Sequence, residues 1–181
     1  MGKEKIDIKL IVVLTLIMII SALVLSFVYQ ATTPLIKEHA AQAKKEAILD
    51  VLPGAVKYEK LEKGGLELYQ GLDKSGSPVG VAFQHEGNGF QGTIILMIGM
   101  DIENQKLLKV KILDQLDTPG LGARMAEQEF KGQFQGKSFS DNFVAKEDVD
   151  AIAGATISSQ AVSDILKDAI ATVEQAYSGG E

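Results

Sequence analysis

The apolar run of residues 10–28 constrains this chain more than any other feature. It contains 19 consecutive residues without a charged side chain. A helix of that length spans roughly 28 Å, close to the hydrocarbon core of a bilayer. Lys3, Lys5 and Lys9 precede the run, and the next basic residue is Lys37. We therefore expect a single-pass protein of the cytoplasmic membrane, with residues 1–9 as a cytoplasmic tail and the domain after the helix outside the cytoplasm.

A cleaved signal peptide is the alternative to a retained anchor. The run is longer than the roughly 7–15 residues of a signal-peptide apolar core. The tripeptides S-F-V and Y-Q-A at residues 26–31 also lack the small residues that a signal peptidase requires. We expect a transmembrane helix at residues 10–29, in contact with the lipid bilayer.

The composition excludes several classes of function. The chain has no cysteine, which excludes disulfides, thiolate zinc sites, iron–sulfur clusters and a cysteine nucleophile. Its two histidines, His39 and His85, are far apart in the sequence, so no metal site is expected. A net charge of -6 disfavours a nucleic-acid partner. An electron carrier in this chain would have to be organic, or a haem with unusual ligands.

Residues 30–54 have the pattern of an amphipathic helix that links the anchor to the domain. Thr33 followed by Pro34 is typical of a helix start, with a capping hydroxyl and proline at the first helical position. Apolar residues then recur at helical spacing until Pro53 and Gly54, which are typical of a helix end.

The pattern of residues 55–181 predicts an α+β domain. Strand-like segments with turns between them occupy residues 66–69, 79–83, 93–100 and 108–112. A short helix with connections is expected at residues 123–134, and the apolar stripe of Ile165, Ala169 and Val173 predicts a terminal helix. Strands in the middle and helices at both ends favour an antiparallel sheet flanked by helices.

Two nucleotide-binding patterns occur in the sequence, but the residues around them do not support nucleotide binding. Residues 87–92 satisfy G-x-G-x-x-G, but a β-branched apolar run follows where a dinucleotide site requires a helix. A glycine-rich turn that lines a ligand is the better interpretation. Residues 117–120 satisfy D-x-x-G, yet the chain has no G-x-x-x-x-G-K-[ST] phosphate loop, which excludes a GTPase.

The segment D-A-I-A-G-A-T at residues 150–156 directly precedes the terminal helix. Its small residues Ala153, Gly154 and Ala155 leave the hydroxyl of Thr156 accessible. Ser158 or Ser159 could cap the helix, and the free N–H groups of a helix start suit a phosphate. On these residues alone, an ordinary capped helix is the simpler interpretation.

The same segment resembles the flavinylation motif D-x-x-[ST]-G-A-[ST] of the FMN-binding domain family. In that family a flavin transferase joins FMN through a phosphoester to the last hydroxyl residue, which corresponds to Thr156. Gly154 and Ala155 match fixed positions, and Asp150 matches the position expected to serve transferase recognition. Ala153 departs from the usual serine or threonine.

A second segment supports the resemblance. D-T-P-G-L-G at residues 117–122 is similar to the family's E-T-P-G-L-G, a loop that lies against the flavin in relatives. The resemblance implies covalent FMN as cofactor and no catalytic residue in the strict sense. The implied cofactor-binding residues are Thr156, Gly154, Ala155, Ser158, Thr118, Pro119, Gly120, Leu121, Gly122 and Phe90, with Met125 as a further apolar contact. Asp117 is interpreted as a structural or hydrogen-bonding carboxylate.

Within the family, the layout resembles the G subunits of Rnf complexes, which couple ferredoxin:NAD oxidoreduction to sodium or proton transport. This implies an electron-carrier subunit whose partners are the other membrane subunits and a flavin transferase. The C subunit of a sodium-translocating NADH:quinone oxidoreductase is the nearest alternative. A non-redox extracytoplasmic assembly factor or sensor is the alternative from another class.

Overall fold

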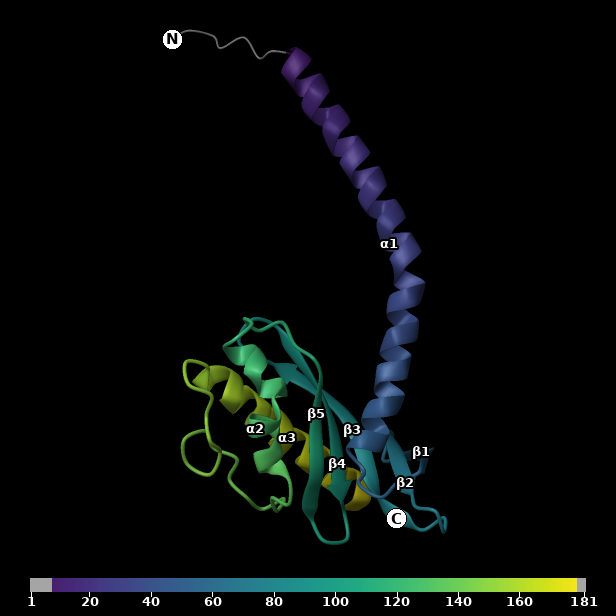
Figure 1. The fold of residues 1–181 in the computed structure, drawn as a ribbon, viewed down its shortest axis with the longest axis vertical. Coiled ribbons are helices and arrows are strands. Elements are labelled where there is room, and N and C mark those ends of the chain that lie inside the picture. Colours follow the sequence, from purple (N-terminus) through teal and green to yellow (C-terminus); the bar gives the residue numbers. More distant parts are fainter. Residues whose placement is uncertain (1–7, 179–181) are drawn as a thin grey trace. The chain divides into compact units, whose positions relative to one another are not determined.

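The computed structural model describes residues 8–178. The chain divides between residues 42 and 43 into two compact units, an apolar helical unit and a mixed α/β unit, whose elements are labelled in Figure 1. Most of the predicted cytoplasmic tail, including Lys3 and Lys5, lies outside the described residues.

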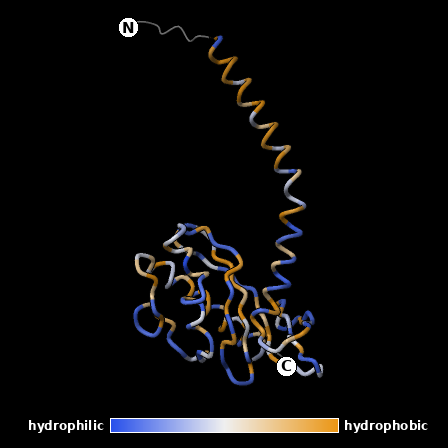
Figure 2. The backbone as a smooth tube through the Cα atoms, in the orientation of Figure 1, coloured by the Kyte–Doolittle hydropathy of each residue, from blue (hydrophilic) through white to orange (hydrophobic). Residues whose placement is uncertain are grey.

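Helix α1 (Ile8–Asp50) is a single helix of 43 residues. Its first half is mostly apolar, as the orange stretches of Figure 2 show, and all of residues 8–32 are exposed. Within residues 8–178, α1 is the one helix that is long and apolar enough to cross a membrane, and none of its most apolar window is buried. A core helix of a globular protein would bury such a surface.

The predicted helix start at Thr33 is wrong, because α1 continues through Pro34 without interruption. Pro34 has no N–H to donate to the preceding turn. Two threonine hydroxyls bond to nearby carbonyls instead: Thr32 Oγ1 donates to the carbonyl of Val28 at 2.9 Å, and Thr33 Oγ1 donates to that of Tyr29 at 2.6 Å. The helix ends at Asp50, just before Pro53 and Gly54 as predicted.

Five antiparallel strands form one sheet in sequential order. They are β1 (Lys57–Lys63), β2 (Leu66–Leu72), β3 (Pro78–Asn88), β4 (Thr93–Asp101) and β5 (Lys106–Asp114). This confirms the predicted α+β class with an antiparallel sheet. Strand β1 was not predicted, and it pairs only with β2, so it forms an edge of the sheet.

Both faces of the sheet are covered. On one face, strand residues such as Phe83, Ile98 and Met100 form a core with residues of α3 (Thr156–Ser178), among them Val162 and Leu166. On the other face, a smaller core of strand residues packs with the last turn of α1 and the residues after it. Its members are Ala47, Ile48, Val51, Leu52, Tyr69, Ala82 and Met97.

The segment at residues 123–134, predicted as a short helix with connections, consists of three pieces. They are the 3-10 turn η1 (Gly122–Ala126), helix α2 (Gln128–Lys131) and the 3-10 turn η2 (Gly132–Phe134). The extended backbone of Glu127, with φ -71° and ψ 148°, separates η1 from α2. The break allows Met125, Phe130 and Phe134 to point into the main core.

Candidate functional site

Two tight turns form the centre of the candidate site. In the first, the N–H of Leu121 donates to the carbonyl of Thr118 at 3.1 Å, and Gly120 has φ +78°. Proline in the second position and a left-handed glycine in the third are typical of a type II turn. In the second turn, the N–H of Ala155 donates to the carbonyl of Ile152 at 2.9 Å, and Gly154 has φ +79°.

The two turns are in contact. A Cβ built on Gly154 would lie 3.2 Å from Cδ2 of Leu121, which is tighter than ordinary van der Waals contact. Gly154 is therefore favoured for two independent reasons, its left-handed backbone and the leucine that packs over it. Segments that are more than thirty residues apart in the sequence thus meet at one point.

A pocket of about 340 Å³ opens between these turns and the start of α3. It is lined by Phe90, Asp117, Thr118, Leu121, Gly122, Gly154, Ala155, Thr156, Ile157 and Ser158. Most of the cofactor-binding residues predicted from the sequence lie in this lining. The volume falls within the range of small-molecule sites, at the small end.

Four predicted residues lie elsewhere. Pro119 and Gly120 are exposed at the tip of the first turn and do not line the pocket. Asp150 lines a separate pocket of about 270 Å³, together with Arg124 and Gln133. Met125 is fully buried in the main core rather than in the pocket lining.

Thr156 is the first residue of α3, and its side chain is half-buried at the pocket wall. The free N–H groups and the positive end of the helix dipole at this position favour an anion. Neither predicted serine is the N-cap, because Ser158 and Ser159 lie within the first turn of the helix. The buried hydroxyl of Ser159 instead accepts from the N–H of Ile152 at 2.9 Å and donates to the carbonyl of Ala155 at 3.0 Å.

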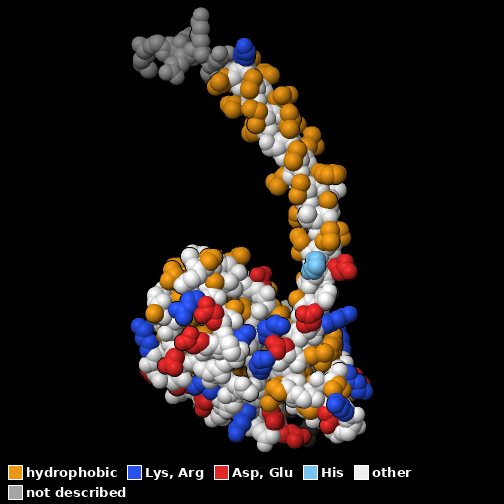
Figure 3. Space-filling model, in the orientation of Figure 1, with side chains coloured by type: hydrophobic (Ala, Val, Ile, Leu, Met, Phe, Trp, Pro, Cys, Tyr) orange, Lys and Arg blue, Asp and Glu red, His pale blue; other side chains and the backbone are white. Residues whose placement is uncertain are grey.

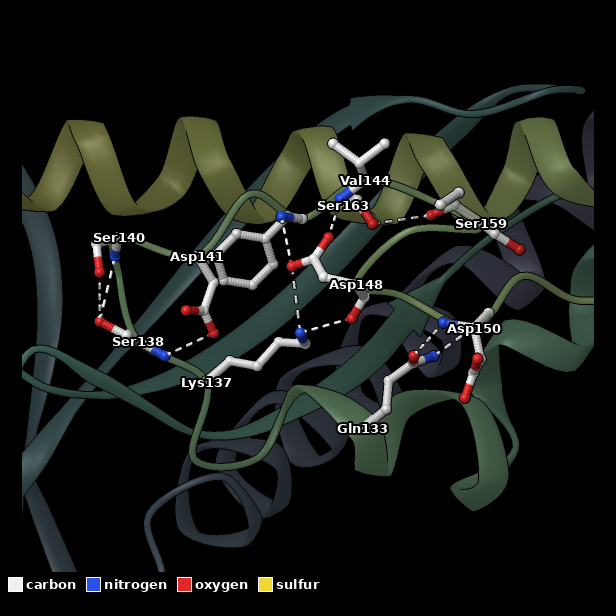
Figure 4. A network of polar contacts seen from close by, with 12 residues as sticks. Gln133, Lys137, Ser138, Ser140, Asp141, Val144, Asp148, Asp150, Ser159 and Ser163 are labelled. Carbon is white, nitrogen blue, oxygen red and sulfur yellow. Dashed lines mark hydrogen bonds and ion pairs between the residues drawn. The ribbon is translucent and has the colours of Figure 1, made fainter.

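The loop before Thr156 is held by a polar network, shown in Figure 4. The side chain of Gln133 bonds to both backbone groups of Asp150: Oε1 accepts from the N–H at 2.7 Å, and Nε2 donates to the carbonyl at 3.2 Å. The carboxylate of Asp148 accepts from the N–H groups of Phe143 and Val144 at 2.9 and 2.6 Å and from Lys137 Nζ at 3.3 Å. Gln133 therefore holds the start of the acceptor segment, and Asp148 holds the loop before it.

These contacts affect the charge state of Asp148. Burial acts to raise the pKa of its carboxyl, and the hydrogen bonds from Val144 and Phe143 and the charge of Lys137 outweigh it. The pKa of Asp148 therefore lies below its usual value.

The pocket has an exposed apolar rim. Phe90 and Ile157 line the pocket and are 62% and 63% exposed, which are high values for large apolar side chains outside the membrane helix. Leu116 precedes Asp117 in the chain, is not part of the lining and is 67% exposed. In Figure 3, hydrophobic side chains gather at the end of the domain formed by the β3–β4 turn and the loop after β5. Such a rim is typical of a binding site.

Asp117 lines the pocket, although the sequence analysis interpreted it as a structural or hydrogen-bonding carboxylate and not as a cofactor-binding residue. It is 5% exposed, and its Oδ1 accepts from the N–H of Gln91 at 3.1 Å. Its Oδ2 is buried and is the one buried side-chain polar atom within residues 8–178 that has no hydrogen-bond partner. Nothing in the sequence pattern distinguished this aspartate from an ordinary structural one.

Comparison with known proteins agrees with this geometry. A model of the FMN-binding domain matches residues 89–171. The G subunit of the ion-translocating oxidoreductase complex of Methanosarcina acetivorans is 34% identical over 172 residues, which cover 90% of this chain and 92% of that protein. The G subunit of the proton-translocating ferredoxin:NAD(+) oxidoreductase complex of Clostridium ljungdahlii is 27% identical over 173 residues, covering 93% and 91%.

A solved structure has the same fold. The C subunit of the Na(+)-translocating NADH-quinone reductase from Parabacteroides distasonis superposes with a TM-score of 0.62 at 16% identity, over 80% of this chain and 96% of that one. The fold and the matched domain define a protein of the FMN-binding class. The chain belongs to the family of G subunits of ion-translocating oxidoreductase complexes. Its apolar α1 makes it a membrane-anchored member.

Proposed function

We propose that this protein is an electron-carrier subunit of a membrane ferredoxin:NAD oxidoreductase complex that couples electron transfer to Na⁺ or H⁺ transport. In this proposal it holds FMN covalently, through a phosphoester on Thr156, and relays electrons between membrane subunits. The observation that carries the proposal is the position of Thr156. Its side chain lines the pocket that the 117–122 loop forms with the 150–156 segment, at the N-terminus of a 23-residue helix.

The residues of the pocket suit both the phosphate end and the ring end of FMN. The N–H groups at the start of α3 suit the phosphate, which must lie at the Thr156 hydroxyl. Phe90, Leu121 and Ile157 offer apolar surface to a planar ring system. Bound FMN would supply the redox chemistry, whereas the protein positions it and sets its electrostatic environment.

Maturation requires a flavin transferase to reach the acceptor. Asp150 is exposed, and Gln133 fixes its backbone, so the start of the motif is presented in one conformation. We propose that Asp150 serves recognition by the transferase. The lysines before the anchor favour an N-terminus in the cytoplasm, and in this proposal the flavin domain lies outside the cytoplasm and meets the other subunits there.

The alternatives have less support. The likeness to the C subunit of the NADH-quinone reductase is one of fold at 16% identity, whereas a G subunit is 34% identical over nearly the full chain. A non-redox assembly factor or sensor gives no role to an acceptor hydroxyl at a helix N-terminus beside an apolar pocket.

The test uses the full-length protein produced together with a flavin transferase. Thr156→Ala should remove covalent flavin, seen as loss of in-gel fluorescence after denaturation, while Thr156→Ser should keep it because the hydroxyl remains. Produced without the transferase, and so without flavin, both variants should unfold at about the temperature of the wild type, since the Thr156 side chain is not part of the core. Covalent flavin on the alanine variant would contradict the proposal.

A further inference from the structure

Asp117 is a buried residue at the candidate site, and one of its two carboxylate oxygens accepts no hydrogen bond. It lines the flavin pocket, and its Oδ2 is enclosed by protein without a donor. A buried acceptor without a partner is destabilising, and such groups are rare in folded proteins. The usual explanation is a partner that is absent from the protein alone.

No cation compensates this carboxylate. Arg124, which lines the neighbouring pocket, is paired with Glu127 at 3.2 Å and with Glu129 at 3.7 Å. Within residues 8–178, no ion pair involves Asp117. In the protein alone, Oδ2 therefore has neither a hydrogen-bond partner nor a paired cation.

We infer that Asp117 is a further cofactor-positioning residue: its free oxygen accepts a hydrogen bond from a neutral N–H or O–H donor of the bound FMN. This inference rests on the proposed function. The FMN phosphate cannot be the partner, because it is anionic and has no donor. The imide N–H of the flavin ring and the ribityl hydroxyls are neutral donors of the required kind.

The same geometry sets the direction of an electrostatic effect. An electron taken up without a proton adds negative charge to a flavin, and a buried carboxylate beside it disfavours that charge. Asp117 therefore lowers the reduction potential of the flavin. Asp117→Asn keeps the shape and the acceptor for Gln91 but removes the charge, so it should raise the potential.

The experiment is a redox titration of full-length, flavinylated protein in detergent. Asp117→Asn should favour the reduced form at least tenfold, which is about 59 mV for a one-electron couple. Asp117→Glu keeps the charge and should stay closer to the wild type. Asp114→Asn is the matched control, because it removes an exposed charge at the end of β5, outside the pocket lining.

Two results separate this inference from the proposed function. A wild-type protein without covalent flavin contradicts the proposed function. A flavinylated Asp117→Asn protein with the potential of Asp114→Asn contradicts the role of Asp117 alone.

If Asp117→Asn takes up no flavin, the unfolding temperature of the empty protein tests the role of Asp117 instead. In the empty Thr156→Ala background, neutralising an unpaired carboxylate should leave the unfolding temperature unchanged or raise it. The bond from the Gln91 N–H to Oδ1 is kept in this variant, so a lower unfolding temperature would show that Oδ2 has a structural partner in the empty protein and would overturn the inference.

Discussion

Gly122 packs directly against Asp117, so that a methyl group on Gly122 would lie 2.7 Å from Asp117 Cβ and overlap the carboxylate. The same methyl group would lie 2.7 Å from the hydroxyl oxygen of Ser158 in the first turn of α3. Space rather than backbone conformation requires glycine here, because its φ is not in the left-handed region. This contact joins the 117–122 loop to the helix that begins with the proposed flavin acceptor.

Gly122→Ala should therefore disrupt the pocket. We expect a loss of stability of about 1–3 kcal/mol from overpacking and a clear fall in flavin per chain. Thermal unfolding and absorbance of the purified protein measure the two effects. Gly132→Ala is the control, because its nearest neighbour is a flexible glutamine side chain at 3.0 Å. Equal stability and flavin content in the two variants would show that the Gly122 contact is unimportant.

Ser159 and Ser163 provide a matched pair on α3, since both are fully buried. Ser159→Ala removes the acceptor of the Ile152 N–H and should destabilise the protein by about 1–3 kcal/mol. It should also slow flavin attachment, because it loosens the acceptor segment. Ser163 only donates to the helix carbonyl of Ser159 at 3.2 Å, so Ser163→Ala should cost much less. Chemical denaturation measures the free energy of unfolding of both variants. Equal losses in Ser159→Ala and Ser163→Ala would contradict this account.

Much of the fold could be predicted because its pattern is local. The alternation of Leu108, Val110 and Ile112 with lysines marked β5, and the stripe on α3 marked the terminal helix. Strand β1 was missed because most of its residues, K-Y-E-K-L-E-K, are charged. Charged residues are common on edge strands, where they prevent pairing with other chains, so a strand of this kind lacks the usual apolar signal.

The helix start at Thr33 illustrates how a local rule can fail. Thr-Pro is a good start signal, but the flanking residues favour a helix on both sides, and the nearby threonine hydroxyls bond to carbonyls of the preceding turn. The other features that the sequence did not predict depend on tertiary contacts. The buried Oδ2 of Asp117 and the contact between Gly122 and Ser158 exist only after the loop packs on α3.

The lowered pKa of Asp148 predicts a pH dependence of stability. A carboxyl whose folded pKa lies below its unfolded value contributes stability above the unfolded pKa and loses it as the pH falls through the folded pKa. The difference in unfolding free energy between wild type and Asp148→Asn should therefore be largest near neutral pH. It should shrink between about pH 5 and pH 2. A difference that stays constant across this range would show that the charge of Asp148 does not matter.

The absence of cysteine allows a direct test of membrane orientation. Glu129→Cys places a single thiol at an exposed position of the flavin domain, and Gly2→Cys places one before the anchor. A membrane-impermeant maleimide is applied to intact cells in which no outer membrane keeps it from the cytoplasmic membrane. It should label Glu129→Cys and not Gly2→Cys. Permeabilised cells should give labelling of both. The reverse pattern in intact cells would contradict an N-terminus in the cytoplasm.

The central claim is that FMN is joined to Thr156, and peptide mass mapping of the native protein tests it most directly. The account predicts a peptide containing residue 156 whose mass is increased by FMN minus one water, as a phosphoester requires, and fragmentation that assigns the addition to Thr156. An unmodified Thr156 in protein from cells that flavinylate other proteins would contradict the claim.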